Sequence, residues 1–499
     1  MSSPATSTKP TLSAPARPRR RRWLRVTIAV LALAIVGPLA FYVYSEFATR
    51  RALEDAESEA ARDLPRWRLA ELEADCKKIA DEDNSALHII AVLSKGKGVS
   101  VSAAPNYEAM FIKLPPTTQL NEQQLRAIRG ELAKIVEPLA EARKLKDMRY
   151  GRFPIMFSDD FISTLIPDHQ NARSLADWLK HDAFLHVQEE RHGDAVDRCR
   201  ACLNTSRSIG DEAFLITLLI RIAIGEVAID SLERVVAQTK DPVEGDYEAS
   251  LKEMQSLLEL EAKECSYVRA LRGERAGYDH LFENIRNGKI STNWLRNLGI
   301  RVGGGSFANP VSEICVNLFP TTLLKYYPDY LQYANEVVEA AKLPRHERTV
   351  KFAEFDAQKR ASSNPLVQSL SLAHENVEKA DNRYHVHLLT AAAAMACERY
   401  WLKHQRWPAT LDTLVQDGLL ARIPTDPFDN QPMRFRHTKE GVVIYSVGMD
   451  RKDDRGTIDP ERTHMPGVDI GFRLWNPALR RQPPRPAVVI EENKERGPR

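Results

Sequence analysis

The sequence predicts a mainly helical protein with one N-terminal transmembrane helix, a large domain of solenoid-like antiparallel helices and a small C-terminal α+β module. Three observations predict this class. Residues 26–45 contain no charged side chain, and apolar residues recur at helical spacing through residues 171–238. Residues 433–437 alternate in polarity before a second apolar run at 442–447, as the strands of a hairpin do.

The chain of 499 residues is long enough for two or three domains. We divide it into a basic, disordered cytoplasmic arm (1–25), a transmembrane helix (26–45), a helical domain (46–370), an α+β module (371–476) and a disordered tail (477–499). With 43% hydrophobic and 28% charged residues, most of the chain is expected to fold in water. The formal net charge is +2, and much of the basic excess lies in the arm, so we expect no nucleic acid partner for the bulk of the protein.

Residues 26–45 are about as long as a helix needs to be to cross the hydrocarbon core of a bilayer. Trp23, Tyr42 and Tyr44 flank the span, where interfacial aromatic anchors belong. An arginine cluster precedes it, which predicts a cytoplasmic N-terminus and an extracytoplasmic body. A cleaved signal peptide is the alternative, although the apolar stretch is long and no clean cleavage site follows it.

The helical domain is expected to begin with a helix that leaves the bilayer and breaks at Pro65. Irregular structure is predicted over 84–118, and a helix over 121–146. From Asn171 to Gln238, Gly193-Asp194 and Gly210-Asp211 are predicted to end one helix and cap the next. Their spacing is typical of paired helices, although the full tetratricopeptide signature is absent.

The apolar stretch 213–229 resembles a second membrane span, but Arg221 and Glu226 interrupt it, so a buried helix is the preferred interpretation. Further helices are expected over 247–287 and 321–342, with a loop at 303–310 and a polar stretch at about 345–365.

Four patterns in the chain are candidates for a catalytic, phosphate-binding or metal-binding site. Gly303-Gly304-Gly305 lacks the context of a phosphate-binding loop. Cys199 and Cys202 are expected to pack inside a helix. Two groups of histidines could in principle hold a metal ion. The first comprises His181, His186 and His192 with Glu190, and the second is the pair His385 and His387. Neither has the HExxH spacing, so we interpret both as ordinary core or surface residues. No nucleophile motif of a known hydrolase is present.

The C-terminal module carries more specific signals. An amphipathic helix over 377–404 presents a stripe of mostly small residues that would allow a sheet to pack closely: Leu389, Ala392, Ala393, Ala396 and Tyr400. A short helix to Val415 and a hairpin of 433–437 with 442–447 follow.

Four segments of this module resemble, in order, motifs of the globular part of type II secretion major pseudopilins. They are Arg406-Trp407-Pro408-Ala409-Thr410-Leu411, Ile423-Pro424-Thr425-Asp426-Pro427-Phe428-Asp429-Asn430-Gln431-Pro432, Tyr445-Ser446-Val447-Gly448-Met449-Asp450 and Val468-Asp469-Ile470. The resemblance covers roughly a fifth of the chain. The whole layout also resembles single-pass membrane proteins of planctomycete-type bacteria. The family's cleavable leader and continuous N-terminal helix are missing, which argues against a pilus subunit.

The resemblance implies a calcium loop after the Tyr-Ser segment. Asp450, Asp453 and Asp454 would supply the hard oxygen ligands that Ca²⁺ prefers. Arg451 replaces the family's glycine, and Lys452 and Arg455 could neutralise the same carboxylates without a metal, so a solvated polar loop is the alternative.

The expected function is that of a non-enzymatic scaffold or interaction protein of the cell envelope, anchored in the cytoplasmic membrane and with protein partners. It could be an accessory component of a secretion machine. An envelope hydrolase with its site in the helical domain is the alternative from another class, and a cluster of side chains with mutually shifted pKa values would favour it.

Overall fold

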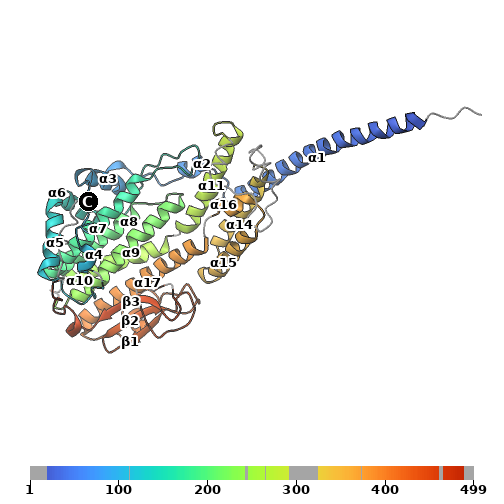
Figure 1. Cartoon of the computed structure of the whole chain (residues 1–499). Helices are drawn as coiled ribbons and strands as arrows, with labels where there is room; N and C mark the ends of the chain where they lie inside the picture. The colour runs from blue at the N-terminus through green and yellow to red at the C-terminus, as the bar shows by residue number, and fades with distance from the viewer. Residues whose placement is uncertain are drawn as a thin grey trace, which may run out of the picture.

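The computed structural model describes residues 19–111, 113–241, 246–264, 266–291, 324–371, 374–459, 463 and 465–487. Most of these residues are helical, and three short strands form one small sheet. A single long helix, α1, projects from a body made of all the other elements (Figure 1). The predicted arm, the Gly303–Gly305 loop and the last residues of the tail lie outside the described residues.

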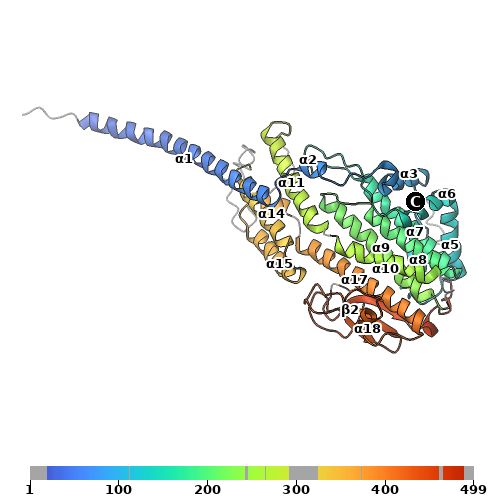
Figure 2. The ribbon, with the colours of Figure 1, turned by 180° about the vertical axis from the view of Figure 1, so that it is seen from behind.

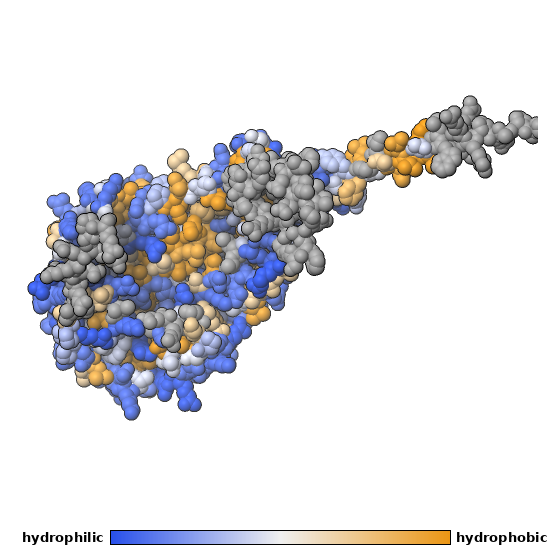
Figure 3. All heavy atoms as spheres, viewed as in Figure 1, coloured by the Kyte–Doolittle hydropathy of each residue, from blue (hydrophilic) through white to orange (hydrophobic). Residues whose placement is uncertain are grey.

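Helix α1 (Arg19–Asp63) contains the predicted membrane span in its outer half. It is the one helix, within the described ranges, that is long and apolar enough to cross a membrane, and a signal sequence would meet the same criteria. Figure 3 shows apolar residues covering this outer half, and large side chains such as Leu33 (76% exposed) make no packing contacts with the body. The helix ends two residues before Pro65, where the sequence predicts the break.

The body begins with short helices, followed by a block of long ones. The short helices are α2 (Leu69–Ala74), α3 (Ser85–Lys95), α4 (Tyr107–Phe111), α5 (Glu122–Leu132) and α6 (Val136–Ala142). The long ones are α7 (Pro167–Gln188), α8 (His192–Arg207), α9 (Leu215–Gln238), α10 (Asp246–Lys263) and α11 (Ser266–Arg286). Helices α14 (Tyr327–Ala341), α15 (Arg345–Ala361) and α16 (Pro365–Leu370) complete the part nearest α1.

Several predicted boundaries in this region were wrong. Residues 85–95 form a helix because Asn84 accepts the backbone N–H of Ala86 and caps it, so 84–118 is not wholly irregular. Gly193 lies within the first turn of α8, and neither Asp194 nor Asp211 caps a helix. The polar stretch 345–365 is mostly the helix α15. By contrast, 213–229 lies in the buried helix α9, as predicted.

The C-terminal region contains α17 (His374–His404), α18 (Leu411–Gln416) and an antiparallel sheet in the order β1 (Arg434–His437), β2 (Gly441–Ser446), β3 (Ile470–Trp475). Phe435 of β1 pairs with Ile444 of β2, which in turn pairs with Phe472 of β3. The predicted hairpin is therefore present, α17 packs on β2 and β3, and β3 is an additional strand.

Helix α17 is shared between the sheet and the helical domain. Figure 2 shows it between the sheet and helices α8, α9 and α10. Its alanines are fully buried, and one hydrophobic core runs without interruption from Ala56 on α1 to Leu474 on β3. The core therefore crosses the boundary that the sequence suggested at residue 370.

The first part of the predicted disordered tail is packed against the body. Arg480 is 2% exposed and forms a double ion pair with Glu398 of α17. The backbone of Gln482 exchanges hydrogen bonds with Thr117 and Gln119. The sequence missed this order because charged and proline residues give no local signal of such long-range partners.

Candidate functional site

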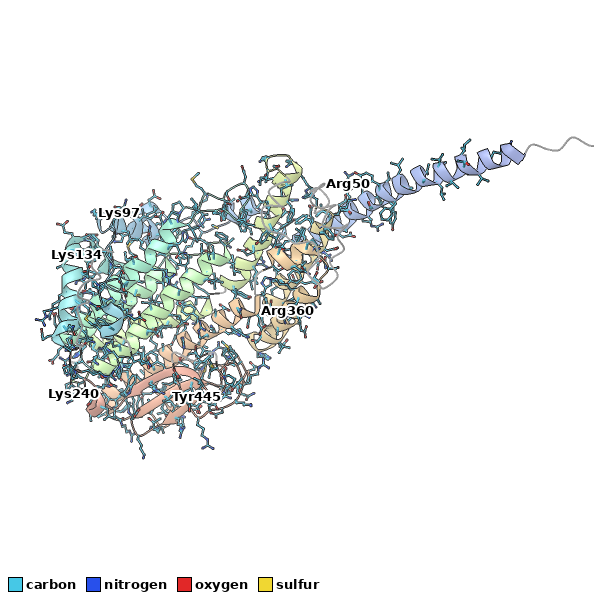
Figure 4. The ribbon with its side chains drawn as sticks, viewed as in Figure 1. Arg50, Lys97, Lys134, Lys240, Arg360 and Tyr445 are labelled. Atoms are coloured by element: carbon cyan, nitrogen blue, oxygen red, sulfur yellow. The ribbon has the colours of Figure 1, made fainter. Side chains whose placement is uncertain are left out.

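The three predicted calcium ligands lie in the loop that follows β2. Asp450 accepts the backbone N–H groups of Lys452 and Gly467, each at 3.0 Å. Asp453 accepts the phenol of Tyr445 at 3.1 Å, and Figure 4 labels this tyrosine in the sheet. These carboxylates therefore shape the loop by binding its own backbone and the sheet.

A fourth carboxylate, that of Asp469, lies beside Asp453 and Asp454. It accepts the backbone N–H of Asp454 at 3.3 Å and that of Gly456 at 2.7 Å. Burial raises the pKa of Asp469 to about 6, and the charges of Asp453 and Asp454 add to the rise. Oδ2 of Asp454 is buried without a hydrogen-bond partner among the residues described. The sequence contained Asp469 in its last pseudopilin-like motif but did not indicate which carboxylates it would meet.

Calcium binding stays a prediction. Within the described ranges, no three or more His, Cys, Asp or Glu side chains are arranged to hold a metal ion. Residues 460–462 and 464 of the same loop lie outside those ranges. Asp469 joins Asp450, Asp453 and Asp454 as a candidate ligand, because it lies close enough to Asp453 and Asp454 for their charges to raise its pKa.

The first histidine group is dispersed over different contacts. His181 lies 2.7 Å from the hydroxyl of Tyr107, and His186 contacts the backbone of Asp182 at 2.8 Å. Glu190 lies beyond the end of α7 with a φ of 61°, so it does not share a helix face with His186. These side chains therefore serve packing, as the sequence analysis expected.

Cys199 and Cys202 are also packing residues. Both are buried in α8, and burial raises the pKa of the Cys202 thiol to about 12. A thiol with such a raised pKa is protonated and unreactive at neutral pH.

His385 and His387 face different surroundings, although both lie within α17. His387 is 2.6 Å from Glu226 of α9. His385 lines a cleft, and burial together with the charge of Arg345 lowers its pKa to about 3. The imidazole of His385 is therefore neutral at physiological pH, and it makes no hydrogen bond to the described residues.

The cleft that His385 lines lies between several helices of the body. Its volume is about 730 Å³, within the range of small-molecule sites. The C-terminal ends of α10 and α14 and the N-terminal parts of α11 and α15 surround it. Apolar side chains form part of the lining, including Leu64, Leu72, Val268, Ala341 and Leu343. None of the described lining residues is a serine, threonine or cysteine.

Asp63, the last residue of α1, anchors one wall of this cleft. Its carboxylate binds Arg272 at 2.6 Å, Arg275 at 2.9 Å and Lys342 at 2.5 Å. Burial would raise the pKa of Asp63, but the hydrogen bonds from Arg272 and Lys342 and the charge of Arg275 outweigh it and hold the pKa well below its usual range. One carboxylate thus serves three cations, and Lys342 pairs in addition with Glu339 at 2.6 Å.

A second ion cluster lies at the end of the cleft near His385. Arg345 and Arg348 share Asp381, each at 2.6 Å. Behind them, Arg221 binds Glu261 with two hydrogen bonds of 2.8 and 2.6 Å, and all four of the Arg221 and Glu261 contact atoms are buried. These internal pairs fix the geometry of the helices around the cleft.

A row of carboxylates on α9 lies outside this cleft. Glu226, Asp230 and Glu233 are spaced to share one helix face, which α17 and β3 approach. Desolvation raises the pKa of Glu233 to about 7, and the charge of Asp230 adds to the rise. Asp230, between Glu226 and Glu233, is exposed to solvent. A carboxylate with the raised pKa of Glu233 is suited to proton transfer near neutral pH.

The structure thus presents a cleft, a carboxylate row and an aspartate loop in three separate places. The sequence analysis singled out the aspartate loop. The cleft depends on contacts between distant segments, and the carboxylate row is local to α9 but acquires its raised pKa only when the body folds around Glu233. Comparison with protein-family models, with curated proteins and with solved structures finds no match to this chain.

Proposed function

We propose that this chain is a single-pass protein of the cytoplasmic membrane that holds a helical, solenoid-like body and a pseudopilin-like module outside the cytoplasm. In this proposal it acts as a non-enzymatic scaffold or interaction protein of the cell envelope, with a role related to secretion. The N-terminus lies in the cytoplasm and the body in the periplasm or an equivalent extracytoplasmic space.

The continuity of α1 is the observation that supports the proposal most directly. Its outer half is apolar and exposed, whereas its inner half packs on α14 through Ala56 and Ala60, which are at most 2% exposed. Asn335 of α14 donates a hydrogen bond of 2.9 Å to the backbone of Ala56. Arg50 marks the region in which the helix reaches the body (Figure 4). A helix joined to the body in this way would hold it at a set orientation to the membrane.

The edge of the small sheet supports an interaction role. Strand β1 lies at one edge of the sheet, and its side chains are partly or fully exposed. Unpaired backbone groups at such an edge are available to a strand from a partner protein.

The topology is tested by protease added to spheroplasts of cells that express the chain with different tags at its two ends. We expect a membrane-bound product in which the body is digested and the N-terminal tag is protected. Protection of the body would contradict the proposed orientation. Loss of the N-terminal tag before protease is added would show that the apolar segment is a cleaved signal peptide.

An envelope hydrolase is the second candidate function, and the raised pKa of Glu233, on a helix face that α17 and β3 approach, favours it. In that case Glu233 would act as a general acid or base near pH 7. The purified protein would be assayed with chromogenic ester and glycoside substrates between pH 5 and 8. Turnover that Glu233→Gln abolishes without changing the circular dichroism spectrum would establish this candidate; no turnover by the unaltered protein would exclude it for these substrates.

A further inference from the structure

The cleft between α10, α11, α14 and α15 combines an apolar lining with a cationic rim. Six of its described lining residues carry a positive charge: Lys263, Arg269, Arg272, Lys342, Arg345 and Arg348. Asp75 and Glu264 are the acidic residues of the same lining. Clefts lined mainly by one sign of charge concentrate ligands of the opposite sign.

Some of these positively charged side chains keep hydrogen-bond donors or solvent exposure with which they could bind a ligand. Lys263 is exposed at the end of α10 and forms no ion pair with the described residues. Arg272, whose side chain is 26% exposed, shares the carboxylate of Asp63 with Arg275 and Lys342. Lys342, at 35%, also pairs with Glu339 at 2.6 Å. Arg345 is 23% exposed and keeps donors beyond those that bind Asp381 and Asn382.

His385 adds a neutral polar group at the end of the cleft. It lies beside Arg345, and Arg348, Asp381 and Tyr384 also surround this end. A neutral imidazole has one donor and one acceptor nitrogen, and neither is used by another described residue. It would therefore bind the polar head of a ligand without changing the charge of the site.

The position of the cleft separates it from the bilayer. Leu64 of the lining directly follows α1, and Ser45 is the last residue of the predicted membrane span. The intervening stretch of α1 would hold the cleft roughly 27 Å along the helix from the membrane, at 1.5 Å per residue. A ligand would reach the cleft from solution or from a carrier rather than directly from the lipid surface.

We propose that this cleft binds a small amphipathic anion, with a carboxylate or phosphate head at Lys263, Arg345 and Lys342 and an apolar body on Leu64, Val268 and Leu343. Guanidinium and ammonium groups match both kinds of head. The volume suits a molecule of small-ligand size and not a folded partner.

The proposal is tested by calorimetric titration of the full chain in nanodiscs of zwitterionic lipid, with empty nanodiscs as the reference. The probes are sodium octanoate, octyl phosphate, 1-octanol and inorganic phosphate. We expect octanoate, octyl phosphate or both to bind the protein at one site, and 1-octanol and inorganic phosphate to bind at least tenfold more weakly. The stronger of the two anionic probes identifies the head group. No binding of either anionic amphiphile, or equal binding of the alcohol or of inorganic phosphate, would overturn the proposal.

Variants localise the site. Lys263→Gln should weaken binding roughly tenfold, as expected for loss of one charge-assisted contact. Lys252→Gln, on the same helix but away from the cleft, is the matched control and should leave binding unchanged. Leu343 is 37% exposed, so Leu343→Glu should fold normally while its carboxylate repels the ligand, whereas Leu343→Gln should retain more binding. Unaltered affinity in Lys263→Gln and Leu343→Glu would place the ligand elsewhere and contradict the assignment.

Discussion

At the scale of single residues, Arg480 and Glu398 form a deeply buried ion pair. Their side chains are 1% and 0% exposed, and the two nitrogen–oxygen distances are 2.6 and 2.8 Å. Arg480 also donates to the backbone oxygen of Thr239 at 3.0 Å. The pair thus joins the C-terminal segment to α17 and to the end of α9.

Replacing Arg480 with methionine would leave the Glu398 carboxylate buried without a partner. We expect Arg480→Met to lower the free energy of unfolding by about 3–5 kcal/mol, measured by chemical denaturation in detergent micelles. Adding Glu398→Leu should recover much of this loss, because both charges are then gone. The exposed Arg485→Met is the control, with an expected change of at most about 0.5 kcal/mol. Equal effects of Arg480→Met and Arg485→Met would contradict the structural role.

The carboxylate of Glu233 predicts a pH dependence of stability. Its pKa is about 7 in the folded protein, mainly through desolvation, and about 4.3 in an unfolded chain. Between these values the folded state binds more protons, so stability is greatest below the unfolded pKa and falls as pH rises through the folded pKa. The side chain in Glu233→Gln cannot ionise. The free energy of unfolding of this variant should therefore fall by about 2 kcal/mol less between pH 5 and 8 than that of the unaltered protein.

Thermal unfolding at a series of pH values measures this difference. Glu137→Gln, an exposed substitution on α6, is the control and should leave the pH profile unchanged. If the profiles of Glu233→Gln and the unaltered protein coincide, the carboxylate is not perturbed as described.

At the scale of elements, α1 is joined to the body by the ion cluster around Asp63. Asp63→Asn removes the charge that three cations share and should destabilise the joint by about 3 kcal/mol. We expect trypsin to cleave faster at Arg66 and Arg68, just beyond the helix. Glu46→Gln on the same helix is the control, because its ion pair with Lys325 is largely exposed. Unchanged cleavage in Asp63→Asn would show that apolar packing alone holds the joint.

The aspartate loop is a second element whose function can be tested separately. If it binds calcium, the folded state is stabilised by mass action, by about 2.7 kcal/mol at a hundredfold excess over Kd. Saturating Ca²⁺ should then raise Tm and a chelator should lower it. Asp453→Asn and Asp469→Asn should each reduce this difference, whereas Asp412→Asn on the short helix α18 should not. A Tm that is insensitive to calcium and chelator in the unaltered protein would exclude the metal site.

At the scale of the whole molecule, the helical domain and the C-terminal module share one core. Helix α17 packs on α9, α10 and α15 and also on β2 and β3. A chain that ends at residue 370 would expose the buried faces of α9 and α10 that α17 covers. We therefore expect this truncated protein to lack a cooperative unfolding transition by calorimetry, because cooperative unfolding requires a continuous core. A sharp transition in the truncated protein would show that the helical domain is an independent unit.

Several elements could be predicted from the sequence because local periodicity determines them. The uncharged span of α1 marks a candidate membrane helix by length and composition alone. The helical period of α17 and the alternation of β1 are local signals, and the structure confirms the helix and the hairpin. The faces they bury were not predicted: α17 is buried on all sides over residues 390–398, and burial does not alternate along β1. The burial of α9 inside the protein could be predicted because placing the charged side chains of Arg221 and Glu226 in lipid costs free energy.

Tertiary structure alone decided which charged residues meet. Asp63 binds residues of α11 and α14, more than two hundred positions along the chain, and Arg480 returns to α17 and α9. The cleft likewise joins segments from Leu64 to His385. Local sequence patterns report the period of an element and the face it buries, whereas an ion pair or a cavity depends on how distant elements are brought together by a common core. The sequence by itself therefore determined the long apolar helix and the C-terminal helix–hairpin, and the packing of the long helices determined the joint at Asp63, the packed segment around Arg480 and the cationic cleft.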